Sequence, residues 1–297
     1  MPFKYFCELV LLSALWGGSF LFMRTTVDEF GPVMLVTLRV GIAGLVLLPL
    51  LLFKRLGREL IENWRPIMFV GITNNAIPYF LFSYSTIYLS AGYASVLNAT
   101  APMFAAIIAF FWLKDKLAPM ALIGLMIGFL GVFVLSMAKL ILQTENTFQA
   151  ILAALVATFF YGLAACFTKR SLQGVKPLTV AAGSLMFATV FLLPISLFYL
   201  PTTTPSINSW LSVLVLGACS TGFAALLFFR LIANVGAYKA ITVTYLVPVF
   251  GIIWGMIFLR EQLTVNMWIG AAMVLIGVAL TTGVFRRRLI PKLGRLN

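Results

Sequence analysis

The sequence contains no histidine and only eight acidic residues among its 297 positions. Most enzymes use histidine and buried carboxylates as general acids, general bases or metal ligands. We therefore expect neither an enzyme, such as a membrane-embedded transferase or protease, nor a bound metal ion. The glycine-rich phosphate loop GxxxxGK[ST] is also missing, which argues against a protein driven by ATP. No cofactor is predicted.

Charged residues make up only 10% of the chain, whereas 62% is hydrophobic and the mean hydropathy is +1.06. A water-soluble core cannot absorb this composition, because soluble chains are about half apolar and a quarter charged. A membrane-spanning helix needs about 20 apolar residues, and ten such helices use almost the whole chain. The spans are predicted near 5–25, 33–53, 66–88, 92–113, 119–138, 149–169, 177–199, 209–230, 238–259 and 264–285.

The net charge of +13 would point to nucleic acid in a soluble protein. Here the basic residues flank apolar runs, so the lipid bilayer is the expected partner and nucleic acid is not. Cytoplasmic loops of membrane proteins are enriched in Lys and Arg. With the N-terminus in the cytoplasm, 17 of the 21 Lys and Arg residues fall on the cytoplasmic side and three on the other, while Arg39 lies within a span. Both termini are therefore predicted to face the cytoplasm.

The first half of the sequence recurs in the second half after a shift of 145 or 146 residues. The matches include Trp16-Gly17 with Tyr161-Gly162, Pro102 with Pro248, and 113–117 with 259–263. Each half, 1–144 and 145–297, then carries five helices, and an odd number places the second copy in the membrane upside down. Inverted repeats are typical of transporters, because two such halves can expose one central site to either face in turn. A duplicated membrane protein of another function is the alternative.

The repeated residues also form motifs that are similar to a known family. Ala14-Leu15-Trp16-Gly17-Gly18-Ser19-Phe20 resembles the opening motif of the drug/metabolite transporter superfamily, in its EamA branch. Leu246-Val247-Pro248 and Leu259-Arg260-Glu261 resemble the last two helices of that family. The resemblance implies an all-α membrane protein of ten helices in two inverted five-helix repeats, a central cavity, and export or exchange of small metabolites. Tyr161 departs from the pattern, because a tryptophan is common at its position.

Three prolines lie inside predicted spans and follow a polar residue by four positions: Pro78 follows Asn74, Pro102 follows Asn98, and Pro248 follows Thr244. A proline within a helix frees the carbonyl four residues earlier, and in hydrocarbon every backbone polar group needs a partner. These positions therefore predict donors and acceptors that suit a polar ligand at membrane depth. Alternatively, the three polar side chains bond a neighbouring helix or the freed carbonyl, and only permit a kink.

Aromatic residues lie close to these positions in the sequence, among them Trp16, Tyr79, Tyr161 and Tyr245. Tyr and Trp offer a flat apolar face with a polar tip, which can stack on a ligand. Trp16, Tyr79 and Tyr161 lie well within their spans, so a place in the interfacial aromatic belt fits them poorly. Packing between helices is the alternative to ligand binding.

Arg39 is the one basic residue placed inside a span, seven residues after Pro32 and so about 10 Å along the helix. A charge at the centre of a span costs roughly 2.5–3.5 kcal/mol on insertion scales and suggests a function. A carboxylate or phosphate of a substrate is a suitable partner. Alternatively, Arg39 reaches the interface or bonds freed carbonyls at a helix end. Its counterpart in the second half is Ser184.

No acidic residue lies deep in a span, and Asp115 and Glu261 are expected to pair with Lys114, Lys116 and Arg260 at helix ends. A proton-coupled pump usually needs a titrating group within the membrane, so exchange or weakly coupled transport is favoured. We predict a secondary transporter, exporter or exchanger, of small polar metabolites such as amino acids in a bacterial plasma membrane, acting as a monomer or homodimer. A facilitative channel for small neutral or anionic solutes is the alternative.

Overall fold

The computed structural model describes residues 2–141, 146–262 and 264–282, and these lie in helices and the turns between them, with no strand among them. The helices are α1 (Phe3–Phe53), α2 (Gly57–Glu62), α3 (Trp64–Val70), η1 (Gly71–Ala76), α4 (Ile77–Tyr88), α5 (Ala91–Asn98), α6 (Ala101–Trp112), α7 (Pro119–Ile141), α8 (Thr147–Ser171), α9 (Pro177–Ser196), α10 (Ile207–Gly217), η2 (Ala218–Phe223), α11 (Ala224–Val235), α12 (Ala237–Ala240), α13 (Val243–Leu259) and α14 (Val265–Thr281).

Six helical stretches within the described residues are long and apolar enough to cross a membrane, and α13 and α14 are shorter apolar helices. Large apolar side chains cover the outside of the bundle. Phe111, Phe133 and Phe198, for example, are 71%, 61% and 85% exposed. Soluble monomers rarely expose apolar surface on this scale, so the surface of the bundle is suited to lipid. The prediction of an all-helical membrane protein is confirmed.

The first two predicted spans lie in the single element α1, which bends at Gly31. Gly31 has φ 71° and ψ 158°, outside the helical region, and Pro32 follows it. Glycine tolerates this positive φ, and proline is well suited to the start of the next helical arm because it needs no N–H donor there. The bend turns the chain back, and so brings Met23 and Arg39 into contact across the two arms.

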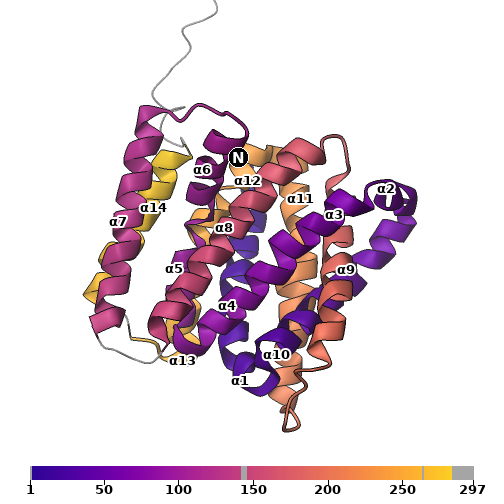
Figure 1. Cartoon of the computed structure of the whole chain (residues 1–297), viewed down its shortest axis with the longest axis horizontal. Coiled ribbons are helices and arrows are strands. Elements are labelled where there is room, and N and C mark those ends of the chain that lie inside the picture. Colours follow the sequence, from indigo (N-terminus) through magenta and orange to yellow (C-terminus); the bar gives the residue numbers. More distant parts are fainter. Residues whose placement is uncertain (1, 142–145, 263, 283–297) are drawn as a thin grey trace, which may run out of the picture.

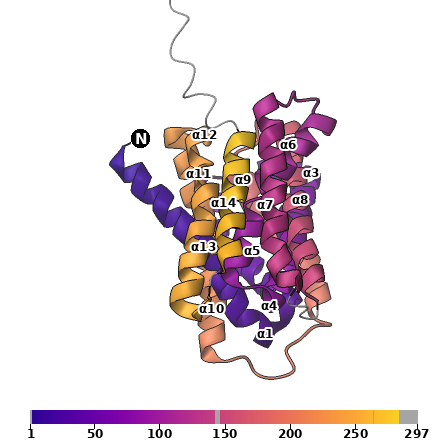
Figure 2. The same cartoon turned by 90° about the vertical axis from the view of Figure 1, so that its left-hand side faces the viewer.

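The N-terminus, α6 and α12 lie at the upper edge of Figure 1, and the loop between α9 and α10 lies at the lower edge. We call these the N-terminal face and the opposite face. Helices α7 and α14 pair at one side of the bundle (left in Figure 1, front in Figure 2). A Cβ atom at Gly277 would lie 2.5 Å from Gly128 Cα, and one at Gly131 would lie 2.9 Å from Gly270 O. These glycines therefore let the two helices pack closely.

The chain accommodates two of the three prolines differently from the predicted kink. Pro102 is the second residue of α6, where a helix needs no N–H donor. Pro78 is the second residue of α4, and the backbone stays helical from η1 into α4. A π-helical segment, η1, precedes Pro78, and the turn Ala99–Thr100 precedes Pro102. Pro248 alone of the three lies inside its helix, α13.

Several local features recur at the spacing of the sequence repeat or within one residue of it. The π-helices η1 and η2 begin 147 positions apart, at Gly71 and Ala218. Lys114 and Arg260 both adopt left-handed backbone, with φ 58° and 52°. After each of them the chain closes the same turn: Asp115 N donates to Ala109 O, and Glu261 N donates to Gly255 O, both at 3.1 Å.

Candidate functional site

Arg39 lies on the second arm of α1 and is only 5% exposed. Its Nε donates to Thr221 Oγ1 of η2 at 3.0 Å, and its Nη1 lies 3.4 Å from Met23 Sδ. The guanidinium carbon stands 3.7 Å from the centre of the Tyr79 ring of α4, which is a cation–π contact. Residues from both halves of the chain thus hold the guanidinium in place.

No carboxylate among the described residues bonds the Arg39 guanidinium. The seven described acids have other partners, and Glu145 lies outside the described residues. The partners are Arg230 for Glu8, Arg24 for Asp28, Ser206 for Glu29, Thr179 for Glu59, Arg58 for Glu62, Lys169 for Asp115, and Ala91 and Gly92 for Glu261. Within the described part of the chain, the positive charge therefore contacts a hydroxyl, a thioether and an aromatic face. A buried charge without a counter-ion is costly, and an anionic group of a ligand would relieve this cost.

An aromatic cluster extends from Tyr79 toward the first arm of α1. Tyr161 of α8 lies 6.5 Å from Tyr79 and 6.1 Å from Phe82 between ring centres, and Phe82 lies 5.5 Å from Phe20. The structure thus brings the predicted site residues Arg39, Tyr79 and Tyr161 together. The Tyr79 ring lies against the guanidinium, and the Tyr161 ring lies next to that of Tyr79.

A second polar pair lies between the halves. Asn75 of η1 donates from Nδ2 to Ser184 Oγ of α9 at 3.0 Å, and the predicted site residue Asn74 donates to Asn75 Oδ1 at 3.2 Å. Ser184 corresponds to Arg39 in the sequence repeat, and Thr221 lies 146 positions after Asn75. The Asn75–Ser184 and Arg39–Thr221 contacts are therefore equivalent bonds, one on each side of the repeat.

The remaining predicted site residues lie elsewhere. Asn98 ends α5, is partly exposed, and bonds no other described side chain. Trp16 packs against Phe228 of α11, 5.2 Å between ring centres. Thr244 donates to Ile241 O of its own chain segment at 2.8 Å. The hydroxyl of Tyr245 contacts Thr282 Oγ1, at the end of α14.

Thr221, Met23 and Asn75 belong to the site but were not predicted from the sequence. A signal for Thr221 was present, because the repeat aligns it with Asn75, the neighbour of the predicted Asn74. No sequence signal existed for Met23, because its contact with Arg39 depends on the bend at Gly31. Two pairings were predicted wrongly: Asp115 bonds Lys169 Nζ at 2.8 Å, and Glu261 accepts backbone N–H groups of α5. These partners lie far away in the sequence, whereas the prediction used adjacent residues.

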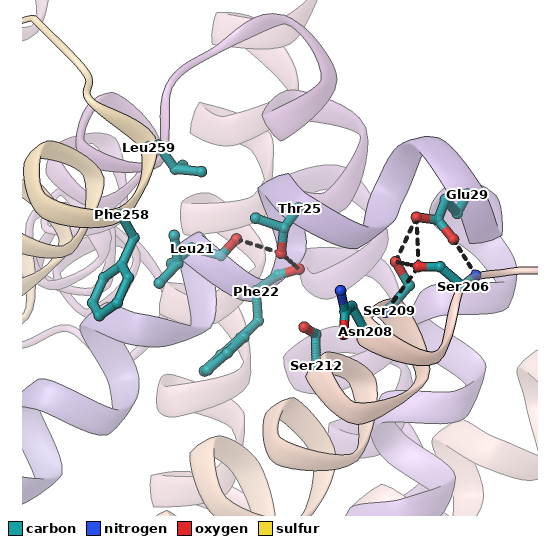
Figure 3. A pocket seen from close by; sticks show the side chains of 10 residues that line it. All are labelled: Leu21, Phe22, Thr25, Glu29, Ser206, Asn208, Ser209, Ser212, Phe258 and Leu259. Carbon is teal, nitrogen blue, oxygen red and sulfur yellow. Dashed lines mark hydrogen bonds between the residues drawn. The ribbon is translucent and has the colours of Figure 1, made fainter.

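A pocket of about 390 Å³ lies between α1, α10 and α13. Its polar side is formed mainly by α10 and the residue before it, and Phe22 and Phe258 lie on its apolar side (Figure 3). Glu29 accepts a bond from Ser206 N at 2.6 Å and one from Ser209 Oγ at 2.7 Å. Glu29 thereby caps the start of α10 rather than facing the pocket as a free carboxylate. The lining residues are Leu21, Phe22, Thr25, Glu29, Ser206, Asn208, Ser209, Ser212, Phe258 and Leu259.

Comparison with known proteins identifies relatives over the whole chain. The model of the EamA-like transporter family matches residues 5–137 and again residues 148–283. The Bacillus subtilis protein named "Uncharacterized transporter YoaV" is 26% identical over 290 residues, which covers 96% of this chain and 99% of that protein. A Streptantibioticus cattleyicolor protein named "Probable terminal-alkyne amino-acid exporter" is 25% identical over 281 residues, or 92% of this chain and 91% of that protein.

A solved crystal structure has a similar fold. It covers 97% of this chain and 100% of its own chain, with a TM-score of 0.69 and 18% sequence identity. At this identity the similarity shows that the fold is shared, and nothing about substrate.

Proposed function

Because this chain belongs to the EamA-like transporter family, we propose that it is a secondary transporter, an exporter or exchanger, of small polar metabolites such as amino acids. It works by alternating access across the plasma membrane. The family and its named relatives are transporters and not enzymes, so the chemistry required is reversible binding.

We propose ten spans in two inverted five-helix repeats, 1–144 and 145–297. The two separate matches to one family model support the duplication, as do the two π-helices and the equivalent turns after Lys114 and Arg260. Two antiparallel halves can rock about a central site without large changes within either half. Both termini then lie in the cytoplasm, and a monomer or homodimer suffices because each chain contains both halves.

The Arg39 guanidinium carries the proposal for the site. It has five N–H donors, of which two are engaged by Thr221 and Met23. The others suit a carboxylate, which guanidinium binds through two parallel hydrogen bonds. Removing water from such a pair strengthens it, and the surrounding helices do so here.

An amino acid suits the rest of the site better than a simple anion. Its ammonium group needs no buried carboxylate, because aromatic faces attract cations and amide oxygens accept hydrogen bonds. Tyr161 and Asn74 supply these groups in the proposed site, with Asn98, Trp16, Thr244 and Tyr245 lining the route or packing around it. The relative named as an amino-acid exporter supports the same class of substrate.

The test is a thermal-shift screen of the purified protein against the twenty proteinogenic amino acids and matched amines and carboxylic acids, followed by uptake into proteoliposomes. We expect zwitterions to raise the melting temperature, and uptake of these compounds to saturate with concentration. A response to carboxylic acids alone would replace the amino acid by an anion. Uptake that does not saturate would favour the channel instead.

A further inference from the structure

Glu261 lies after the end of α13, in the second half of the chain, and contacts the start of α5 in the first half. Its Oε1 accepts a bond from Ala91 N at 2.6 Å, and its Oε2 accepts one from Gly92 N at 3.1 Å. The next N–H group, of Tyr93, donates to Ser90 Oγ at 3.3 Å. Unpaired N–H groups at a helix start are satisfied by such acceptors, and a carboxylate is further favoured there by the helix dipole.

Two glycines leave room for this carboxylate. A methyl group at Gly255 would collide with Glu261, whose carboxyl group supplies the three nearest atoms. A Cβ atom at Gly92 would stand 3.3 Å from Glu261 Oε2. The carboxylate is therefore enclosed between α5 and α13.

The equivalent acid of the first half makes no such contact. Asp115 follows the same left-handed turn as Glu261, at the end of α6. Its carboxylate pairs with Lys169 at 2.8 Å, and the two side chains are 48% and 63% exposed. Among the described residues it accepts no bond from a helix start. The two equivalent acids thus differ: Glu261 joins two helices of opposite halves, whereas Asp115 makes an exposed ion pair.

Below Glu261 the same two helices are in close contact. Ser95 of α5 is fully buried and its side chain packs on Gly251 of α13. Gly251 in turn lies against Gly17 of α1, where a Cβ atom would stand 2.8 Å from Gly251 N. Any opening of the bundle between α5 and α13 must first break the Glu261 bonds and then uncover Ser95.

We propose that Glu261 is a latch that holds the bundle closed on the face opposite the N-terminus, and that the structure represents the latched state. This inference rests on the proposed alternating access. Charge-assisted hydrogen bonds are among the strongest in proteins, so the latch biases the transporter toward the state in which this face is closed. Asp115, without a helix start to bond, leaves the N-terminal face free to open.

The reporter for the test is Ser95→Cys, in a chain whose three native cysteines are replaced by serine. Cysteine is close to serine in size, and at position 95 it stays buried while α5 and α13 are in contact. A membrane-impermeant maleimide is applied to vesicles from the face that carries Ser206, and the rate of labelling is measured. Glu261→Gln removes the charge of the latch, and Gly255→Ala displaces the carboxylate without altering it.

We expect Glu261→Gln and Gly255→Ala each to raise the labelling rate about tenfold, because each shifts the population toward the open state. The matched controls Asp115→Asn and Glu29→Gln leave the rate unchanged. Labelling at the parent rate in both latch variants, or an equal rise in Asp115→Asn, would overturn the latch. The two latch variants act at different residues, so failure of one to fold leaves the other as the test.

Labelling requires no substrate, which separates the latch from the proposed function. If the parent protein transports amino acids but the latch variants label at its rate, the latch is wrong and the transporter stands. If the latch variants label faster but the parent protein shows no saturable transport, the proposed function is wrong and the latch is supported.

Discussion

Arg39 and Thr221 are separated by 182 residues in the sequence and joined by a hydrogen bond of 3.0 Å. The bond ties the second arm of α1 to the π-helix η2, and so links the two halves at the proposed site. The Asn75–Ser184 bond has the same length and the equivalent place in the repeat. Only one of the two bonds carries a charge, and this difference gives the site a polarity that its pseudo-symmetry alone would not provide.

Loss of the Arg39 charge should weaken the binding of carboxylate ligands, whereas loss of the Ser184 hydroxyl at the equivalent position should not. We expect Arg39→Gln to weaken amino-acid binding roughly 10- to 100-fold, which corresponds to about 1.5–3 kcal/mol for a hydrogen bond to a charged group. Arg39→Lys should recover part of this loss, because it restores the charge but not the planar fork. The control is Ser184→Ala, and all three are measured as apparent Kd by thermal shift. Equal losses in Arg39→Gln and Ser184→Ala would contradict a charge-based site.

Thr221 should matter for stability through its acceptor oxygen. Thr221→Val keeps the shape of the side chain but leaves Arg39 Nε without its partner, and an unsatisfied buried donor costs about 1–3 kcal/mol. Thr221→Ser retains the oxygen and should melt close to the parent protein. Thr189→Val is the control, because the Thr189 hydroxyl bonds only Leu185 O of its own helix. Thermal melts in detergent measure the difference, and a Thr221→Val protein as stable as Thr221→Ser would refute the role of the oxygen.

The position of Arg39 within a span could be predicted from the sequence, whereas the π-helices could not. Composition and periodic charge placed the helices, and a charge within an apolar span marked Arg39 directly. The π-helices were not predicted, because their i→i+5 hydrogen bonds leave no pattern in side-chain polarity. Such segments are frequent at functional sites, but they are recognised only in a structure. The directions of the Thr221 and Asn75 side chains depend on these π-helices, because the extra residue in each π-helical turn rotates the neighbouring side chains.

The hydrogen-bond partners of the acidic residues were likewise not predictable from the sequence. Glu29, Glu59 and Glu261 each cap the start of a helix in the other half of the chain. Their partners include backbone N–H groups, which every residue except proline possesses, so residue identity does not reveal these bonds. The sequence indicated nearby Lys and Arg instead, because charge is visible in a sequence and an uncapped helix start is not.

The contact between α7 and α14 predicts a steric effect on stability. Gly277→Val places a branched side chain against Gly128 Cα, and overpacking of this kind costs about 1–3 kcal/mol. Gly57→Ala is the control, because no atom lies within 4 Å of the added methyl group. Melting temperatures in detergent should fall for Gly277→Val alone. A Gly277→Val protein that melts with the parent would show that the two helices do not approach this closely.

The bonds of the Glu29 carboxylate lead us to predict that the stability of the folded protein depends on pH. It lies in the bend of α1, outside the proposed spans 5–25 and 33–53. The bond from Ser206 N, and then that from the Ser209 hydroxyl, lower the pKa of its carboxyl below the ordinary 4.5. A depressed pKa adds stability that is fully present above the unfolded value and disappears as pH falls through the folded value.

We therefore expect Glu29→Gln to melt below the parent protein at pH 7, and the gap to close as the pH falls below 4.5. Glu62→Gln is the control, because Glu62 makes only an exposed pair with Arg58, and exposed pairs contribute little. A gap that stays constant from neutral pH to well below 4.5 would show that the ionised Glu29 carboxylate is not what stabilises the start of α10.

Counterflow in proteoliposomes tests alternating access most directly. Vesicles are loaded with an unlabelled amino acid that shifts the melting temperature, and entry of the labelled compound is followed from outside. A carrier whose two halves expose one site in turn predicts faster initial uptake into loaded than into empty vesicles, with transient accumulation above equilibrium. Uptake that is equal in loaded and empty vesicles and rises linearly with concentration would contradict the carrier.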